Sequence, residues 1–264
     1  MGLERLRVLL QPSRTAAART MGAAAGLDLR ALFTSPRMER DWQAASARIE
    51  TLGLTPEAGI NPGDRRALYY LMRLLRPARV LEIGTQAGAS AVHLAMGLAD
   101  AHGSADERRL LTVDIKDVNR ADNAAWRMFR LPQSPADAMR RLGFDGLVEF
   151  RMGRSVDVLR NTYDRYDLIF LDGDHRLNTV AAKIPLAVPR LNPGGFILLH
   201  DFFPGLRPLR PVDHLAVGPQ RPQLAVQQLQ RAGWPLDVLP LGDLPWPTKL
   251  GTSKTSLALL GRAV

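Results

Sequence analysis

Short apolar runs alternate along this chain with stretches whose apolar residues recur at helical spacing. The runs of strand length lie at residues 79–83, 110–115, 147–151, 167–171, 196–199, 236–239 and 256–260. Several are separated by polar turns and by helical patterns, and this alternation predicts a parallel sheet with crossover helices. The run at residues 167–171 is apolar after Asp167, as expected for a strand that is buried on both faces.

The same pattern predicts where the helices begin and end. Residues 36–52 read as a helix that is closed by Gly53, and a second helix begins near Asp64, a residue type suited to the N-cap. Further helices are expected at residues 180–191 and 223–232.

A loop of small residues follows the first strand and indicates a ligand site. It begins Glu82-Ile83-Gly84-Thr85-Gln86-Ala87-Gly88-Ala89-Ser90. Gly84 makes the turn, Gly88 lets the backbone pass close to a ligand, and a helical pattern follows. A dinucleotide-binding loop requires glycine where this chain has Gln86, so the loop favours a ligand that lacks a pyrophosphate.

Polar side chains gather where the fourth and fifth strands end. Asp172, Asp174 and His175 follow the fourth strand, and His200 and Asp201 follow the fifth. If these strands are neighbours, Asp172 and Asp201 lie within roughly 5–10 Å of each other. Two carboxylates at that separation repel unless a cation or proton lies between them, and Mg²⁺ is the simplest such ion.

Composition limits the classes of protein that remain. The chain has no cysteine, so a metal must be held by carboxylates, histidines or carbonyls. The net charge is +9, but the arginines are scattered and no aromatic-interleaved basic stripe is present, so nucleic acid is not expected as a partner. No apolar run approaches the ~18 residues of a membrane span, and we expect a cytoplasmic protein.

The sequence Glu82-Ile83-Gly84-x-x-x-Gly88 resembles the first motif of class I S-adenosylmethionine (SAM)-dependent methyltransferases. The resemblance covers about residues 65–264 and implies a Rossmann-like α/β fold. In this fold a seven-stranded, mostly parallel sheet with its last strand antiparallel has helices on both faces. The implied domains are an N-terminal helical extension, residues 1–62, and a methyltransferase domain, residues 63–264. The residues that the resemblance assigns to SAM are Glu82, Gly84, Thr85, Gly88, Ser90, Asp114 at the ribose, Ser155 near adenine, and Asp172.

Asp172-Gly173-Asp174 with a later acid pair resembles a metal-dependent subgroup that methylates small-molecule hydroxyls, including those of sugars. The resemblance implies that Asp172, His200 and Asp201 hold a divalent ion, Mg²⁺ in the first instance, and that Asp174 acts as a base. His200 departs from the pattern, which has an acid there, and histidine suits Mn²⁺ or Zn²⁺ better than Mg²⁺.

A second departure is Phe202, where catechol-type relatives carry a metal-binding Asn. A metal-free reaction with His175 or His200 as the base therefore stays open.

The leading hypothesis is O-methylation of a small-molecule acceptor. The alternatives are a metal-independent methyltransferase, another reaction on the same SAM scaffold, methylation of RNA or protein, and an inactive SAM-binding partner subunit. Residues 116–143, 204–222 and 245–253 are expected to cover the substrate, and the N-terminal helices to support a homodimer.

Overall fold

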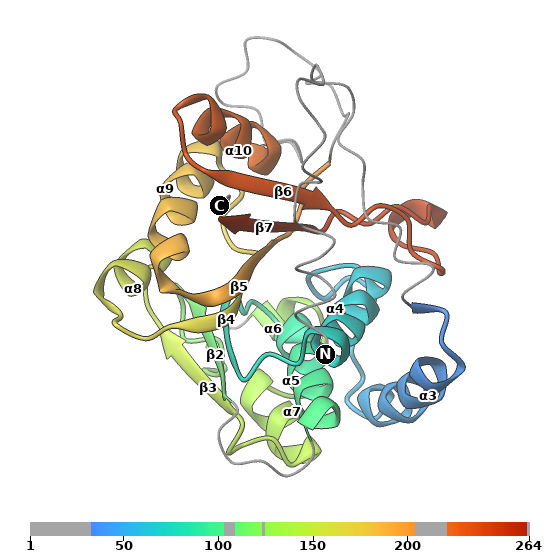
Figure 1. The fold of residues 1–264 in the computed structure, drawn as a ribbon. Coiled ribbons are helices and arrows are strands. Elements are labelled where there is room, and N and C mark those ends of the chain that lie inside the picture. The colour runs from blue at the N-terminus through green and yellow to red at the C-terminus, as the bar shows by residue number, and fades with distance from the viewer. Residues whose placement is uncertain (1–32, 103–108, 123–124, 204–220, 263–264) are drawn as a thin grey trace.

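One mixed sheet forms the centre of the molecule in this computed structural model, which describes residues 33–102, 109–122, 125–203 and 221–262 (Figure 1). The seven strands within these residues run in the order β3-β2-β1-β4-β5-β7-β6. Only β7 is antiparallel to its neighbours, as predicted. The strands are β1 Arg79–Ile83, β2 Arg109–Asp114, β3 Val148–Met152, β4 Tyr166–Leu171, β5 Leu191–Leu199, β6 Leu236–Pro240 and β7 Ala258–Arg262.

Helices cover both faces of the sheet. Figure 1 shows α3, α4, α5 and α7 on one side and α8, α9 and α10 on the other. Successive strand residues point to opposite faces, so Phe170 packs in the core beneath α4 and α5, and Ile169 packs in the second core. The helices are α3 Pro36–Glu50, α4 Pro62–Leu75, α5 Ala89–His102, α6 Ala125–Met128, α7 Pro135–Leu142, α8 Ser155–Asn161, α9 Leu177–Ala187 and α10 Arg221–Arg231, with short 3₁₀ turns η1 Val188–Arg190 and η2 Lys249–Gly251.

Strand register places the carboxyl ends of the central strands side by side. Ile83 of β1 pairs with Leu171 of β4, and Leu171 pairs with Leu199 of β5. The residues that come next along the chain, Asp172 and His200 among them, therefore emerge at one edge of the sheet.

Two predicted boundaries were wrong. The helix expected at residues 180–191 runs instead from Leu177 to Ala187, followed by η1. The strand expected at residue 196 begins at Leu191, which pairs with Tyr166 across a register shift. The Pro-Gly-Gly stretch that suggested a stop thus lies within an irregular part of β5.

The N-cap of α4 is Asn61 and not Asp64. The Asn61 side chain accepts a hydrogen bond of 3.0 Å from the backbone N–H of Asp64. Asp64 therefore lies inside the first turn, and its fully buried side chain is directed to the interior.

Helix α3 packs against α4 and α5. The ring of Trp42 lies 5.4 Å from that of Tyr69 and 6.0 Å from that of His93, and Arg66 forms an ion pair with Glu39. Residues 1–32 of the predicted extension lie outside the described residues, so the division at residue 62 and the homodimer stay predictions.

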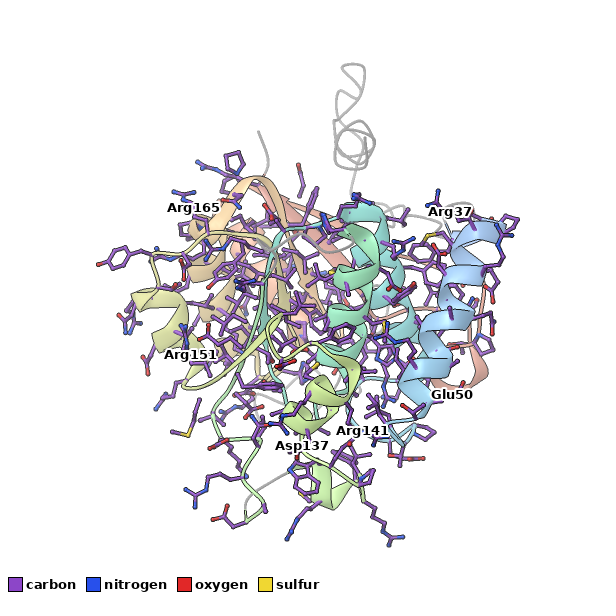
Figure 2. All side chains as sticks on the ribbon, turned by 90° about the horizontal axis from the view of Figure 1, so that it is seen from below. Arg37, Glu50, Asp137, Arg141, Arg151 and Arg165 are labelled. Carbon is purple, nitrogen blue, oxygen red and sulfur yellow. The ribbon has the colours of Figure 1, made fainter. Side chains whose placement is uncertain are left out.

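Charged side chains are distributed around the periphery on several elements, as Figure 2 shows for its labelled residues. These are Arg37, Glu50, Asp137, Arg141, Arg151 and Arg165. The four labelled arginines lie on α3, on α7, on β3 and just before β4. Across the described helices, none is long and apolar enough to cross a membrane.

Candidate active site

Two adjoining clefts lie at the carboxyl ends of the central strands. The narrow cleft has a volume of about 410 Å³ and the wide cleft about 880 Å³. Their shared wall consists of Gly84, Asp114, Gly173 and Asp174. The strand order reverses between β1 and β4 at this point, which is where ligands bind in open α/β sheets.

Gly84 is required by the path of the loop after β1. Its φ is +109°, and an added Cβ would lie 2.4 Å from the carbonyl oxygen of Asp172. Gly88 also has a positive φ, but an added Cβ there would lie 2.8 Å from Pro135 of α7. Gly88 lines neither cleft, so the close approach it permits is to α7 and not to the expected ligand.

Glu82 supports this loop from below. The Thr112 hydroxyl donates to Glu82 Oε2 at 2.5 Å and lies 2.6 Å from the hydroxyl of Thr85. Burial raises the pKa of Glu82 to about 8, against the hydroxyls of Ser90 and Thr112, which lower it. Glu82 is fully buried and lines neither cleft, so it holds the loop as a neutral carboxyl at neutral pH.

Asp114 stands between the clefts. Its two carboxylate oxygens accept hydrogen bonds from the backbone N–H groups of Gln86, at 2.9 Å, and Lys116, at 3.1 Å. Each oxygen keeps further acceptor capacity, which suits a pair of ribose hydroxyls. Ser155 lines the narrow cleft and Ser90 lines the wide one.

A cluster of two carboxylates and two imidazoles lines the wide cleft. His200 Nδ1 lies 2.6 Å from Asp172 Oδ1 and 3.6 Å from Asp201 Oδ1. His175 Nε2 lies 3.9 Å from Asp172 Oδ1 and 3.6 Å from Asp201 Oδ2. The structure therefore brings together four of the five residues that the sequence placed at the ends of β4 and β5, all but Asp174.

The donor set of this cluster fits a divalent ion. Asp172, His175 and His200 each offer a ligand atom, and the three atoms lie within 4.8 Å of one another. Both ring nitrogens of His200 are buried, and neither makes a well-directed hydrogen bond with any described residue. The three-residue group contains His175, where the sequence predicted Asp201.

His200 is a poor candidate for a base in the absence of an ion. Burial opposes its charged form, but the carboxylates of Asp172, Asp64 and Asp201 together raise its pKa well above the ordinary range. An imidazole that is already protonated at neutral pH does not accept a proton.

The carboxylate of Asp174 is hydrogen-bonded to residues that follow it closely in the chain. It accepts hydrogen bonds from the Arg176 side chain at 2.7 Å, the Arg176 backbone N–H at 2.9 Å and the Thr179 hydroxyl at 3.0 Å. The Arg176 hydrogen bonds hold the pKa of Asp174 well below its usual range. A carboxylate so stabilised is a weak base, and in the absence of an ion the partly exposed His175 is the better candidate for that role.

Asp64 is a site residue that sequence reasoning missed. Its carboxylate lies 3.6 Å from His200 Nε2 and accepts hydrogen bonds from Thr255 at 2.5 Å, Ser256 at 3.1 Å and Asn61 at 2.8 Å. Burial raises the pKa of Asp64, but His200 and these donors lower it more, and the carboxylate stays ionised. The only signal in the sequence was an acid at the start of a helix.

Lys183 was also missed. It is only 2% exposed, lines the narrow cleft, and donates a hydrogen bond of 3.2 Å to the carbonyl of Asp174. Burial lowers the pKa of Lys183, against the charges of Asp174 and Asp172. The spacing of Val180, Lys183 and Ala187 on α9 was a signal, because it places the lysine on the buried face.

The three segments that were predicted to cover the substrate differ in whether they line the clefts. Residues 116–143 contain α6 and α7, and none of their described residues lines either cleft. Residues 204–220 lie outside the described part of the chain. Thr248 and Lys249, from the third segment, do line the wide cleft, and Trp246 Nε1 ties that segment to the carbonyl of Gly63 at 2.9 Å.

Residues 56–62 form a further wall that the sequence did not predict. All of them line the wide cleft. Arg65, itself buried, donates to four carbonyls of the preceding turn, those of Thr55, Pro56, Ala58 and Ile60. A segment assigned to the N-terminal extension thus shapes the site.

Comparison with known proteins agrees with the fold. A family described as "Methyltransferase domain" matches residues 81–202. A catechol O-methyltransferase from Niastella koreensis is 26% identical over 135 residues, which are 50% of this chain and 52% of that protein. The chain is thus aligned with about half the length of this curated relative.

Solved structures share the fold. An O-methyltransferase from Bacillus cereus in complex with SAH has a TM-score of 0.54 and 21% identity, over 85% of this chain and 89% of that one. The O-methyltransferase TomG from Streptomyces achromogenes, involved in tomaymycin synthesis and solved with SAM, has a TM-score of 0.53 and 20% identity, over 85% and 90%. Residues 81–202 are thus similar to a methyltransferase domain, and the sheet around them has the fold of O-methyltransferases solved with SAH or SAM.

Proposed function

We propose that this protein transfers the methyl group of SAM to a hydroxyl of a small-molecule acceptor, with assistance from a divalent ion. The observation that carries the proposal is the cluster of Asp172, His175 and His200 on the wall of the wide cleft, directly beside the loop after β1. The names of the relatives, a catechol O-methyltransferase and O-methyltransferases solved with SAH or SAM, support it.

SAM would lie across both clefts. Its adenosine would enter the narrow cleft, with Ser155 near adenine and the Asp114 carboxylate accepting hydrogen bonds from the ribose hydroxyls. Its methionine part would follow Gly84, Thr85 and Ser90 into the wide cleft. That path brings the methyl group toward the cluster and the acceptor.

Asp172, His175 and His200 are the residues that would hold an ion. A bound divalent ion lowers the pKa of a hydroxyl that contacts it. Groups of this chain would position the acceptor, hold the clustered charges in place and accept the proton that the acceptor hydroxyl loses. Transfer from a sulfonium then depends mainly on alignment of acceptor oxygen, methyl carbon and sulfur.

A metal-free version is the second candidate, and one observation favours it. His200 lies among three carboxylates that raise its pKa, so its imidazolium supplies positive charge without an ion. His175 would then be the base, oriented by Asp201, whose Oδ2 lies 3.6 Å from Nε2.

Transfer of labelled methyl from SAM to a panel of catechols, sugars and polyketide-like phenols tests the proposal. Enzyme stripped with EDTA is compared with enzyme resupplied with Mg²⁺, Mn²⁺ or Zn²⁺. Activity that returns only with an ion supports the leading version, and equal activity without one selects the metal-free version. Methylation of RNA or protein alone contradicts both.

The finer features belong to the same proposal. We place the acceptor among sugars and natural products, the enzyme in the cytoplasm, and a homodimer contact on the N-terminal helices. The N-terminal extension would end near residue 62, although residues 56–62 also line the cleft.

A further inference from the structure

We infer that Asp64 is a positioning residue for the ion site: its carboxylate orients the His200 ring so that the cluster binds Mn²⁺ or Zn²⁺ in preference to Mg²⁺. This inference rests on the metal-assisted form of the proposed function. It assigns a role to a residue that lies 108 positions before Asp172 in the sequence, on a helix that covers one face of the sheet.

The environment of Asp64 fixes its carboxylate in place. The side chain is fully buried and accepts hydrogen bonds from three donors in two parts of the chain. Asn61 donates from the start of α4, and Thr255 and Ser256 donate from the segment before β7. A carboxylate held by three donors has little freedom to rotate away from its fourth neighbour, His200.

His200 lies between Asp64 and the cluster, with one ring nitrogen toward each. Nε2 is the nitrogen near Asp64, at 3.6 Å, and Nδ1 is the nitrogen near Asp172, at 2.6 Å. The separation at Nε2 is slightly longer than a hydrogen bond, so a small ring rotation closes it. With its N–H directed to Asp64, the ring presents the Nδ1 lone pair to the ion site.

A carboxylate behind a metal-binding histidine is a recurrent arrangement in metal sites. It fixes the tautomer and ring orientation and raises the basicity of the ligand, and its loss commonly weakens metal binding about 10–100-fold. Two imidazoles and one carboxylate form a donor set that suits Zn²⁺ or Mn²⁺, whereas Mg²⁺ prefers oxygen ligands alone.

A purely structural role is the competing explanation. Asp64 joins α4 to the segment before β7, and loss of that joint alone would lower stability. The two roles predict different effects on ion binding. Removing a hydrogen-bond donor to Asp64 weakens the contact between α4 and the segment before β7 as much as removing the charge of Asp64 does. It leaves the negative charge beside His200 unchanged.

Calorimetric titration of the EDTA-stripped full chain with MnCl₂, ZnCl₂ and MgCl₂ separates the two roles. Asp64→Asn keeps the shape and removes the charge, and Ser256→Ala removes one donor while leaving the charge beside His200. We expect the wild type to bind Mn²⁺ and Zn²⁺ at least tenfold more tightly than Mg²⁺. Asp64→Asn should bind Mn²⁺ about 10–100-fold more weakly, and Ser256→Ala within about threefold of the wild type.

Titration of each variant with SAH, together with its melting temperature, checks that the fold is intact. Equal Mn²⁺ affinity in Asp64→Asn and wild type overturns the inference, as does an equal loss in Ser256→Ala. A wild type that transfers methyl but binds no ion overturns the inference and leaves the transferase standing. A protein with Asp64-dependent ion binding that methylates no acceptor contradicts the proposed function and not the inference.

Discussion

The charge of an acidic side chain in this site depends on its surroundings. Glu82 and Asp64 are both fully buried acids, yet burial raises the pKa of Glu82 to about 8 whereas the donors around Asp64 keep its pKa low. The difference follows from their partners, because Asp64 has three hydrogen-bond donors and a cationic imidazole nearby. The first acid stabilises the loop as a neutral group, and the second faces His200 as an anion.

Glu82→Gln should remove a pH dependence of stability. The folded pKa of about 8 exceeds the ordinary value of 4.5, so the folded state retains a proton that the unfolded state loses between these pH values. The contribution of Glu82 is fully present below pH 4.5 and is lost as pH rises toward 8.

The measurement is the melting temperature of the wild type and of Glu82→Gln from pH 5 to pH 9. We expect the stability of the variant relative to the wild type to increase with rising pH. The change in the free energy of unfolding should be on the order of a few kcal/mol at most. Parallel curves would contradict a neutral Glu82.

Asp172→Asn should abolish methyl transfer and leave the fold intact. The substitution keeps the side-chain shape and the backbone hydrogen bond to Ile83, and it removes the charge that lies 2.6 Å from His200 and 3.9 Å from His175. We expect a fall in kcat/KM of about a thousandfold, corresponding to the several kcal/mol that charge stabilisation by a bound ion supplies.

The matched control for Asp172→Asn is Asp237→Asn on the exposed surface of β6, which should retain full activity. Melting temperature and SAH affinity show whether each variant is folded. An active Asp172→Asn enzyme would remove this residue from the mechanism.

At the scale of the elements, the loop after β1 is shaped by packing between strands. Gly84 lies close to the backbone that follows β4. The segments that follow β1 and β4 therefore constrain each other's path. This contact places Asp172 beside the start of the loop. The loop after β1 and the residues that follow β4 are thus parts of one packed unit.

Gly84→Ala should destabilise the protein more than Gly143→Ala does. Both glycines have a positive φ, but an added Cβ meets the Asp172 carbonyl at 2.4 Å in the first case and nothing within 4 Å in the second. We expect a loss of about 1–2 kcal/mol for Gly143→Ala from the left-handed backbone alone. Gly84→Ala should lose about 1–3 kcal/mol more from the close contact.

Urea denaturation of the two variants measures this difference. A Gly84→Ala variant as stable as Gly143→Ala would mean that the loop does not pass against the exit of β4.

The order of the helices and strands was predictable from the sequence, but the residues at which they begin and end were less predictable. Each of the seven predicted runs overlaps a strand of the structure, because runs of strand length bounded by turn residues leave a local signal. The end of α9 was misjudged because the register shift that draws Leu191 into β5 depends on Tyr166, a residue of another strand.

On the scale of the whole molecule, the wide cleft is assembled from distant parts of the chain. Residues 56–62, the loop after β1, the ends of β4 and β5, and residues near 248–256 all line it. Asp64 and Thr255, which meet beside His200, are 191 positions apart. Local pattern does not contain such contacts, which explains why the strand-end residues were predicted and Asp64 was not.

The central claim is that the paired clefts bind SAM with Asp114 at the ribose, and calorimetric titration of SAM into the full chain tests it most directly. We predict one site per chain, with binding weakened about 10–100-fold in Asp114→Asn, because a neutral amide replaces an anionic acceptor of two hydrogen bonds. Wild-type protein that binds no SAM, or an Asp114→Asn variant that binds it equally well, would contradict the account.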